Sequence, residues 1–528
     1  MARPTPAPLP RGLGIEIDRS VRFTDEGHVL IGGTPPCALR LPATGVGSVI
    51  RGISGARPTD LDERILARTL VETGLAHPRP APVSLDERTR IVLIGRGDAI
   101  DPAALVTTLD LIAEHHPGAR PVVVGATEIA ARTARERGAR TVDGPTGGPG
   151  ALAAALAACD GEFLALLEAG SEPSPGWLEN ALGHFVDPDV AAVVPRTLAA
   201  RRPLGPTGMT VAALHALRAD RGADPAPVLP WGHGHRGRGR PSPPEEHGAA
   251  DPLEPVRVLV ARRAAVRVSS DAGELAGTDL VWRAAEEGWS VRYEPRSRVR
   301  LPMPDGIGSY LRSRFVQAAE GGTAARRYGR WATGPEMSPH GLAALLSAIG
   351  GRPVSGLVIG AAGVALTARG LVEKTGAPPI EAVRPAVVDL TRAVGSGVRA
   401  ARTTWWPVLA GMVVAGAATG EDGRRRRGLV RGALLAGSVL TVPHLASWRR
   451  RRGTAPVGPL GWTAVAVAGD AACALGTWWG VARSGSLAPL IPRVRSPLFS
   501  TSLESPQVGA GVEGSGAKPA WGSHVSES

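Results

Sequence analysis

Short apolar runs and helical segments alternate strictly between residues 88 and 195. Runs such as TRIVLIG and EFLALLE are typical of buried strands, and segments with apolar residues at helical spacing separate them. With connections this short, the β-α-β-α order predicts an α/β fold with a parallel, doubly wound sheet. Ligands of such sheets bind beyond the carboxyl ends of the strands. Gly95 and Glu168 stand at two of these ends and mark the expected cleft.

A smaller unit precedes this region. Residues 11–80 contain two short strand-like runs and then two segments with helical spacing, which predicts a small winged-helix-like module. Asp60 is the expected N-cap of the second helix, with Glu63 three residues later. The segment HPRPAPVS at 77–84 has the composition of a linker. The sheet domain is then expected over residues 86–335.

The last third of the chain is rich in Gly and Ala. A membrane-spanning helix needs about 20 apolar residues, and most apolar runs here are shorter or are interrupted by Arg, Pro or Asp470. The sequence therefore predicts a helical, membrane-associated region at 340–495 with one or two shallow hairpins, and an Ala/Gly-rich soluble bundle is the alternative. The apolar runs of this region cover 354–368, 404–419, 428–447 and 460–482. The tail that follows, at 496–528, has the composition of a disordered segment.

The positive charge is concentrated in one segment. The formal net charge is +12, and residues 424–452 contain nine arginines and no acidic residue. Because these arginines lie among apolar runs, they favour an anionic membrane surface over nucleic acid, for which the sequence has no binding-fold signature. Three widely separated cysteines without a CxxC pattern agree with a reducing interior. We therefore expect the protein at the cytoplasmic face of the cell membrane.

Several longer stretches occur together in a fixed order. They are LPRGLGIEIDRSVRF, ARTLVETGLAHPRPA, PGWLENALGHFVDPDVAAVVPR, DLVWRAAEEGWSVRYEP and WWGVARSGSLAPLIPR. With this set, the chain resembles the glycosyltransferase of the mycofactocin system, a family 2 enzyme of the GT-A fold, over most of residues 9–493. The resemblance implies an inverting transfer of glucose from UDP-glucose to premycofactocin, a redox cofactor made from the C-terminal Val-Tyr of a small peptide. It also implies that the first module is a peptide-recognition module, whose strand edge could hold the precursor peptide by strand addition.

In the GT-A fold, an Asp-x-Asp turn after a strand usually holds a divalent cation. This hard cation, Mg²⁺ or Mn²⁺, neutralises the leaving diphosphate. Here the turn reads LEAGSE, with Glu168 at the first Asp position and Gly170 at the last. Glu172 follows two residues later. The resemblance therefore implies Glu168 and Glu172 as candidate metal ligands, and the alternative is that both are solvated turn residues.

The positions expected to bind the nucleotide also depart from the family pattern. Where an Asp pair should hold the nucleoside, the sequence has Gly125 and Ala126. Asp98 matches a family Asp after the first strand, and it either contacts the nucleoside or caps the following helix. The N-terminus of the next Ala-rich helix, from Gly148 to Gly150, offers free backbone N–H groups to the diphosphate.

The general base is expected in a Glu-Asp pair that precedes a helix. Ala276 and Gly277 occupy those positions. Asp279 matches a later Asp of the family pattern and is the candidate catalytic residue, and support of the helix start is its alternative role.

These departures leave two main hypotheses for the function, beside a third in which the chain is a structural membrane-surface protein without a ligand. In the first, the chain is an active glycosyltransferase, and arginines such as Arg257, Arg262 or Arg263 replace part of the missing charge. In the second, it is a catalytically inactive GT-A-fold binding or scaffold protein of the same pathway.

Overall fold

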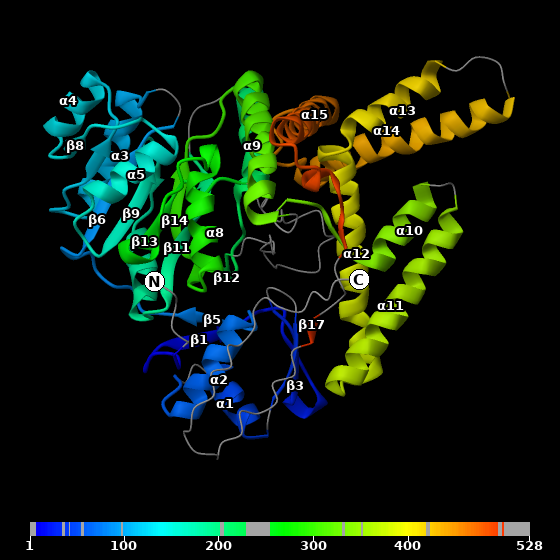
Figure 1. Cartoon of the computed structure of the whole chain (residues 1–528), viewed down its shortest axis with the longest axis horizontal. Coiled ribbons are helices and arrows are strands. Elements are labelled where there is room, and N and C mark those ends of the chain that lie inside the picture. Colours follow the sequence, from blue (N-terminus) through cyan, green and yellow to red (C-terminus); the bar gives the residue numbers. More distant parts are fainter. Residues whose placement is uncertain are drawn as a thin grey trace.

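A nine-stranded, parallel-rich sheet forms the centre of the sheet domain (Figure 1). The computed structural model describes residues 7–33, 37–41, 43–53, 57–96, 99–200, 205–228, 254–329, 333–349, 352–418, 423–494 and 499–500. The strands of the sheet are β6 (Thr89–Ile94), β7 (Val122–Val124), β8 (Arg140–Val142), β9 (Phe163–Glu168), β10 (Glu172–Pro173), β11 (Val190–Ala199), β12 (Ala226–Pro227), β13 (Leu259–Arg262) and β14 (Ser290–Leu301).

The order of these strands is β10-β14-β11-β13-β9-β6-β7-β8, with β12 paired to β14. The neighbours from β9 to β8 run parallel, as do β11 and β14, whereas β13 is antiparallel to both of its neighbours. The parallel strands are joined by helices, as the alternating sequence pattern predicted. The expected doubly wound α/β class is therefore confirmed.

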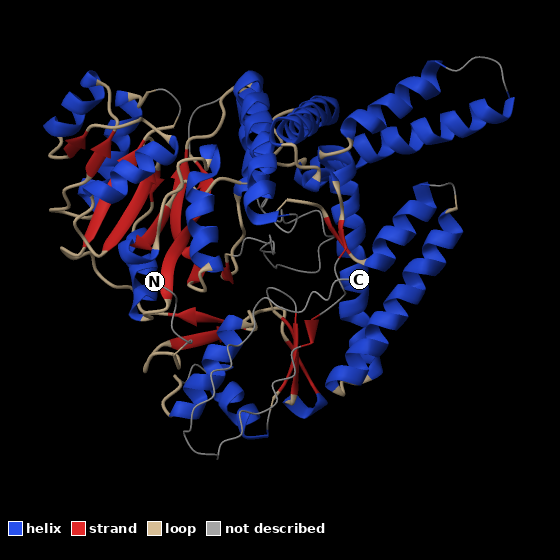
Figure 2. Cartoon of the chain, viewed as in Figure 1, coloured by secondary structure: helices blue, strands red, loops and turns tan. Residues whose placement is uncertain are grey.

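Helices cover both faces of the sheet (Figure 2). Val122 and Val124 of β7 belong to one apolar layer and Val123 to the other, so alternate residues of one strand face opposite layers. The first layer includes residues of α5 and α8, and the second includes residues of α3, α4 and α6. These helices are α3 (Pro102–His115), α4 (Glu128–Glu136), α5 (Gly148–Ala158), α6 (Trp177–Leu182) and α8 (Ala276–Glu286).

The first module has two small sheets and two helices. Asp60 caps α2, and its Oδ1 accepts a hydrogen bond of 2.7 Å from the backbone N–H of Glu63, as expected. The elements are β1 (Gly14–Ile17), β2 (Arg22–Thr24), β3 (Val29–Gly32), β4 (Cys37–Arg40), α1 (Ala43–Ile53), α2 (Leu61–Glu72) and β5 (Ala76–Arg79). One sheet has the order β17-β4-β3-β2, and its strand β17 (Phe499–Ser500) comes from the far end of the chain and runs parallel to β4.

The predicted linker at 77–84 is partly wrong. Its first three residues belong to β5, which pairs antiparallel with β1 and places Pro78 opposite Ile15. The apolar neighbours Leu75 and Ala76 are fully buried, so the strand is held by the core of the module. Proline is tolerated at such a position because it lies in a two-stranded edge, where one backbone N–H is dispensable.

A buried ionic cluster joins the first module to the sheet domain. Arg68 of α2 makes two hydrogen bonds, of 2.8 and 2.9 Å, with the carboxylate of Asp187, and Arg292 of β14 contacts the same carboxylate. Although burial disfavours the charged carboxylate, the Arg292 and Arg68 guanidiniums lower the pKa of Asp187 to about 2. The module is therefore attached through charges that are shielded from water.

Helices dominate the chain after the sheet. The elements are α7 (Pro206–Ala219), which precedes β13, and then α9 (Ile307–Tyr328), β15 (Glu336–Met337), α10 (Pro339–Ile349), α11 (Pro353–Thr375), α12 (Pro379–Thr403), α13 (Trp406–Ala418), α14 (Gly423–Arg451), α15 (Pro459–Ser484) and β16 (Arg493–Val494). In each of the helix pairs α10–α11 and α13–α14 the two helices lie side by side, and both pairs project from the rest (Figure 1). Two described helices, at 354–375 and 459–484, are long and apolar enough to cross a membrane by length and composition.

Helix α15 is held tightly against α9. A Cβ added to Gly476 would lie 2.2 Å from the carbonyl oxygen of Phe315, so the two backbones touch at this glycine. Asp470, in the middle of α15, is buried and contacts Arg218 of α7 at 2.6 Å and His444 of α14 at 2.8 Å. These contacts tie α15 to the sheet domain and to α14.

Candidate functional site

Glu168 and Arg257 meet at the carboxyl edge of the sheet. Glu168 ends β9 and lies opposite Ile94, the last residue of β6. Because β13 runs antiparallel to β9, the residues just before β13 reach this same edge, and Arg257 is one of them. The Nη1 atom of Arg257 lies 3.2 Å from Oε2 of Glu168, and both side chains are 8% exposed. Glu168 is therefore the buried partner of a guanidinium and not a solvated turn residue.

Glu172 belongs to a different part of the sheet. Thr108 of α3 fixes the intervening turn. Its Oγ1 accepts a hydrogen bond from the N–H of Gly170 (2.9 Å) and donates one to the backbone carbonyl of Ser171 (2.8 Å). Glu172 then begins β10 and pairs with Arg300 of β14. No group of three His, Cys, Asp or Glu residues suited to a metal ion occurs in the described part of the chain. The described residues around Glu168 thus do not match the donor set of a divalent cation, which takes several oxygen ligands.

A buried polar cluster lies close enough to Arg257 for the positive charge of this arginine to act on it. Gln317 of α9 donates a hydrogen bond of 2.8 Å to Glu254, and Arg314 of α9 donates one of 3.3 Å to Gln317. His215 of α7 has its Nε2 atom 3.7 Å from Oε1 of Glu254. The cluster therefore brings together α7, α9 and the segment that leads into β13.

His215 is neutral at this position. The pKa of His215 is lowered to about 4, mainly by burial; Glu254 opposes this shift, and the charges of Arg257, Arg314 and Arg96 add to it. Both ring nitrogens are buried without a hydrogen-bond partner among the described residues. A neutral imidazole with two unused polar atoms has spare capacity for a ligand.

The N-terminus of α5 lies beside the same edge. The backbone N–H of Gly95 donates a hydrogen bond of 2.8 Å to the carbonyl of Thr146, and an added Cβ on Gly147 would lie 3.6 Å from the Cα of Arg96. Gly148 has a φ of +71°, and nothing lies within 4 Å of a Cβ built on it. Gly150 is exposed in the first turn of this helix. The predicted anion-binding turn is therefore open and next to Arg96.

Asp98 lies outside the described residues. The following helix, α3, is capped by Asp101, whose carboxylate accepts a hydrogen bond from the N–H of Ala103. The alternative role considered for Asp98, as the cap of this helix, is thus filled by another residue.

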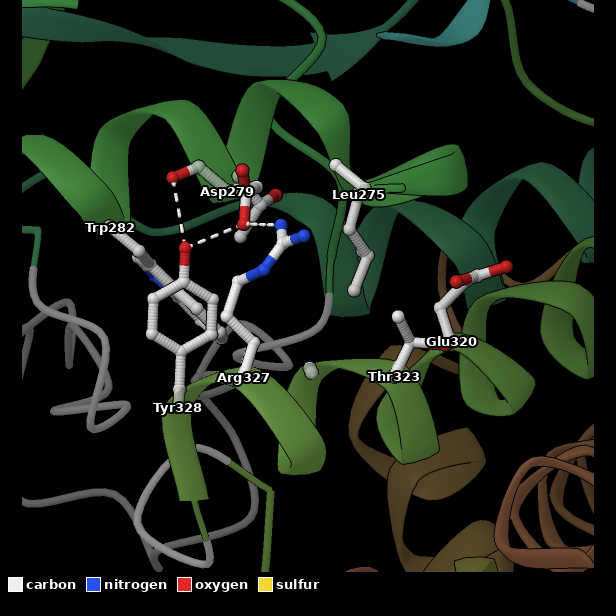
Figure 3. Close-up of a pocket in the computed structure, with 10 residues that line it drawn as sticks. Leu275, Asp279, Trp282, Glu320, Thr323, Arg327 and Tyr328 are labelled. Carbon is white, nitrogen blue, oxygen red and sulfur yellow. Dashed lines mark hydrogen bonds and ion pairs between the residues drawn. The ribbon is translucent and has the colours of Figure 1, made fainter. Parts of the chain in front are cut away.

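Asp279 is held in a network of hydrogen bonds (Figure 3). Its Oδ1 accepts hydrogen bonds from Arg327 and, at 2.6 Å, from the hydroxyl of Tyr328. Its Oδ2 lies 3.4 Å from Arg283, one turn along α8. The adjoining cavity measures about 20 Å³, room for about one water molecule, and is lined on its other side by Glu320 and its neighbours on α9. Both carboxylate oxygens are therefore engaged, and Oδ1 holds α8 to the end of α9.

The arginines proposed as substitutes for the metal separate into two groups. Arg262 contacts Glu162 and stacks over Phe163, at the amino end of β9, and Arg263 follows it. Only Arg257 of the three lies at the carboxyl edge. Sequence reasoning did not single out His215, Glu254, Arg314 or Gln317, because each is a lone polar residue without a motif.

Comparison with known proteins identifies the family. No family model matches the chain. The pre-mycofactocin glycosyltransferase of Mycobacterium tuberculosis (strain ATCC 25618 / H37Rv) is 30% identical to it, over an alignment that covers 92% of this chain and 99% of the relative. The chain belongs to the pre-mycofactocin glycosyltransferase family. The resemblance inferred from its sequence stretches is thereby confirmed.

Solved structures also resemble parts of this family member. Glucosyl-3-phosphoglycerate synthase from Mycobacterium tuberculosis, in complex with Mn²⁺, UDP-glucose and phosphoglyceric acid, is 17% identical, with a TM-score of 0.29 over 46% of this chain and 80% of that chain. Mannosyl-3-phosphoglycerate synthase from Rubrobacter xylanophilus is 18% identical, with a TM-score of 0.28 over 45% and 73%.

Proposed function

We propose that the protein transfers glucose from UDP-glucose to premycofactocin, with inversion at the sugar carbon. The observation that carries this proposal is the match to a pre-mycofactocin glycosyltransferase along 92% of the chain. The doubly wound sheet supports it, because such sheets bind nucleotides at the carboxyl edge of their strands.

The donor would bind at the edge that Glu168 and Arg257 share. The free N–H groups of α5, at Gly148 and Gly150, are suited to the diphosphate, since a helix N-terminus attracts anions. Asp98 would contact the nucleoside. A divalent cation at Glu168 and Glu172 would need further ligands beyond these two, and the described residues do not supply a group of three.

Asp279 remains the candidate base from the family pattern. It would have to release Arg327 and Tyr328 before it could take a proton from the acceptor hydroxyl. We therefore assign it first to the anchoring of α8, with the base role as the alternative.

A second candidate function is binding without catalysis. The pairing of Glu168 with Arg257 and the engaged oxygens of Asp279 favour it, because both acidic groups are already neutralised. In this case the protein would hold premycofactocin or its precursor peptide for other enzymes, with the first module as the peptide site.

The C-terminal helices support a place at the membrane. Helices at 354–375 and 459–484 are apolar and long, and α11 leaves large apolar side chains such as Leu357 exposed. The arginines of 424–452 would face anionic lipid at the cytoplasmic side.

Incubation of the purified full-length protein with UDP-glucose and premycofactocin tests the function. A product heavier by one hexose, seen by mass spectrometry, is the expected result. Retained acceptor binding without any hexose transfer, with and without Mn²⁺, would instead establish the binding protein.

A further inference from the structure

The charge balance at the carboxyl edge favours an anion. Arg96, Arg257 and Arg314 bring three positive charges to the cluster, and Glu168 and Glu254 bring two negative ones. His215 adds none at neutral pH, because burial and the arginines lower its pKa to about 4. Because Arg96 is exposed, this positive surplus is accessible to an anion from solvent, which would balance it.

Arg257 occupies the place where a metal would contribute its charge. Its guanidinium is almost fully buried and lies against Glu168, at the position of the first Asp of the family's metal turn. A divalent cation on Glu168 would be brought next to this guanidinium, and the two like charges would repel each other. The metal and Arg257 are thus alternatives for the same carboxylate.

Two further observations favour a ligand at this edge. Both nitrogens of His215 are buried without a hydrogen-bond partner among the described residues, and its side chain is only 3% exposed. The open first turn of α5 lies beside Arg96, where Gly148 leaves free space. A diphosphate offers the oxygen acceptors that such N–H groups need.

We infer that Arg257, together with Arg96, replaces the divalent cation and binds the diphosphate of the nucleotide-sugar donor at this edge. The inference rests on the proposed glycosyl transfer and names its leaving-group site. The bond between the sugar carbon and the β-phosphate oxygen breaks, and its electron pair stays on the nucleoside diphosphate. The acceptor oxygen forms the new bond to the sugar carbon, and its proton leaves to solvent. Arg257 and Arg96 hold the negative charge that develops on the diphosphate.

Glu168 then has the opposite role from a metal ligand. In the free protein it neutralises Arg257 and competes with the diphosphate for the guanidinium. Removal of the negative charge of Glu168, as in Glu168→Gln, therefore releases Arg257 for the donor. If Glu168 were a metal ligand, the same substitution would weaken binding.

Calorimetric titration of the full-length protein with UDP tests the inference, in EDTA and in Mn²⁺. We expect the same UDP affinity in both, and a loss of roughly 10- to 100-fold in Arg257→Met and Arg96→Met, since charge-assisted hydrogen bonds are lost. Glu168→Gln is expected to bind UDP in EDTA at least as tightly as the unmodified protein. Arg262→Met is the matched control, because this arginine lies at the other end of β13 and should leave the affinity unchanged.

The variants are chosen so that misfolding does not imitate the result. Arg96 is exposed, so its substitution should leave the melting temperature unchanged. The double variant Arg257→Met/Glu168→Gln removes both buried charges together and should fold but bind UDP weakly, whereas Arg257→Lys should restore part of the affinity. Binding of UDP only in Mn²⁺, with loss in Glu168→Gln, would overturn the inference.

A separate assay distinguishes this site from the proposed function. If UDP binding in EDTA depends on Arg257 but no hexose reaches premycofactocin, the site stands and the transfer is refuted. If the hexose is transferred only with Mn²⁺, the transfer stands and the arginine site is refuted.

Discussion

Substitution of Arg68 by Met should loosen the first module from the sheet domain. The side chain of Arg68 is 6% exposed, and it donates both of the hydrogen bonds that Asp187 receives from α2. Loss of one partner of a buried ion pair costs about 3–5 kcal/mol. Because Arg292 still neutralises Asp187, we expect the lower end, about 3 kcal/mol.

Hydrogen exchange of the amides in α2 and β5 measures this change directly. A cost of about 3 kcal/mol corresponds to opening that is roughly 100-fold more frequent. Arg51→Met is the matched control, since Arg51 pairs with Glu63 on the surface with 58% of its side chain exposed, and such a pair contributes at most about 1 kcal/mol. Exchange in β6 and β9 should not change in either variant.

The pH dependence provides a second measure of the same contact. The pKa of Asp187 falls from 3.8 to about 2 on folding, so its contribution is complete above pH 4 and is lost as the pH falls towards 2. Docking should therefore weaken in acid in the unmodified protein, and less in Asp187→Asn. Equal protection of α2 in Arg68→Met and Arg51→Met would refute the argument that this cluster attaches the module.

Three further outcomes follow from other contacts. Gly476→Ala should lower the melting temperature, with a cost of about 1–3 kcal/mol, because its Cβ meets a backbone oxygen, whereas Gly437→Ala in α14 has free space and should not. Asp279→Asn should lower the melting temperature but change hexose transfer per folded molecule by less than about tenfold, because Asp279 anchors α8. If Asp279 were the general base, its loss would cost about 10²–10⁴-fold. Conversion of Arg449–Arg452 to Gln should weaken sedimentation with anionic vesicles, by about 1 kcal/mol per arginine near the surface, and added salt should reduce the difference.

The sheet could be predicted because its signal is local. Each strand between residues 88 and 195 is an apolar run followed by a helical segment, and the period of the pattern alone separates them. Helix α12 lies in the region predicted as helical, but no apolar run marks it, because its buried face consists of small residues such as Ala382, Ala386 and Ala393, which give little hydrophobic contrast. The strand β5 was missed because the prolines of the segment at 77–84 suggested a linker, although the partner strand β1 decides the pairing.

The candidate site could be predicted only in part. The edge that carries Glu168 follows from the strand pattern, but its partner Arg257 lies 89 residues later in the chain. Glu254 lies in the same segment as Arg257, but His215 and Arg314 come from two further segments, and sequence spacing contains no information about such a meeting. The contacts depend on the tertiary arrangement of α7 and α9 against the sheet.

The stretches that carried the family resemblance pair with one another in space. His77 contacts Asp18 at 2.9 Å, and His184 contacts Glu294 at 2.8 Å. Asp187, which lies in the same stretch as His184, contacts Arg68. These contacts hold the first module together and attach it to the sheet domain.

Strand β17 gives the chain an unusual order of completion. The sheet that begins with β2, β3 and β4 acquires its last strand from residues 499 and 500. On the ribosome, where synthesis adds about 5–20 residues per second, that edge of β4 therefore stays open until nearly the whole chain has emerged. An unpaired edge is a place where another strand can add, so the nascent protein exposes a docking edge that the finished one covers with its own end.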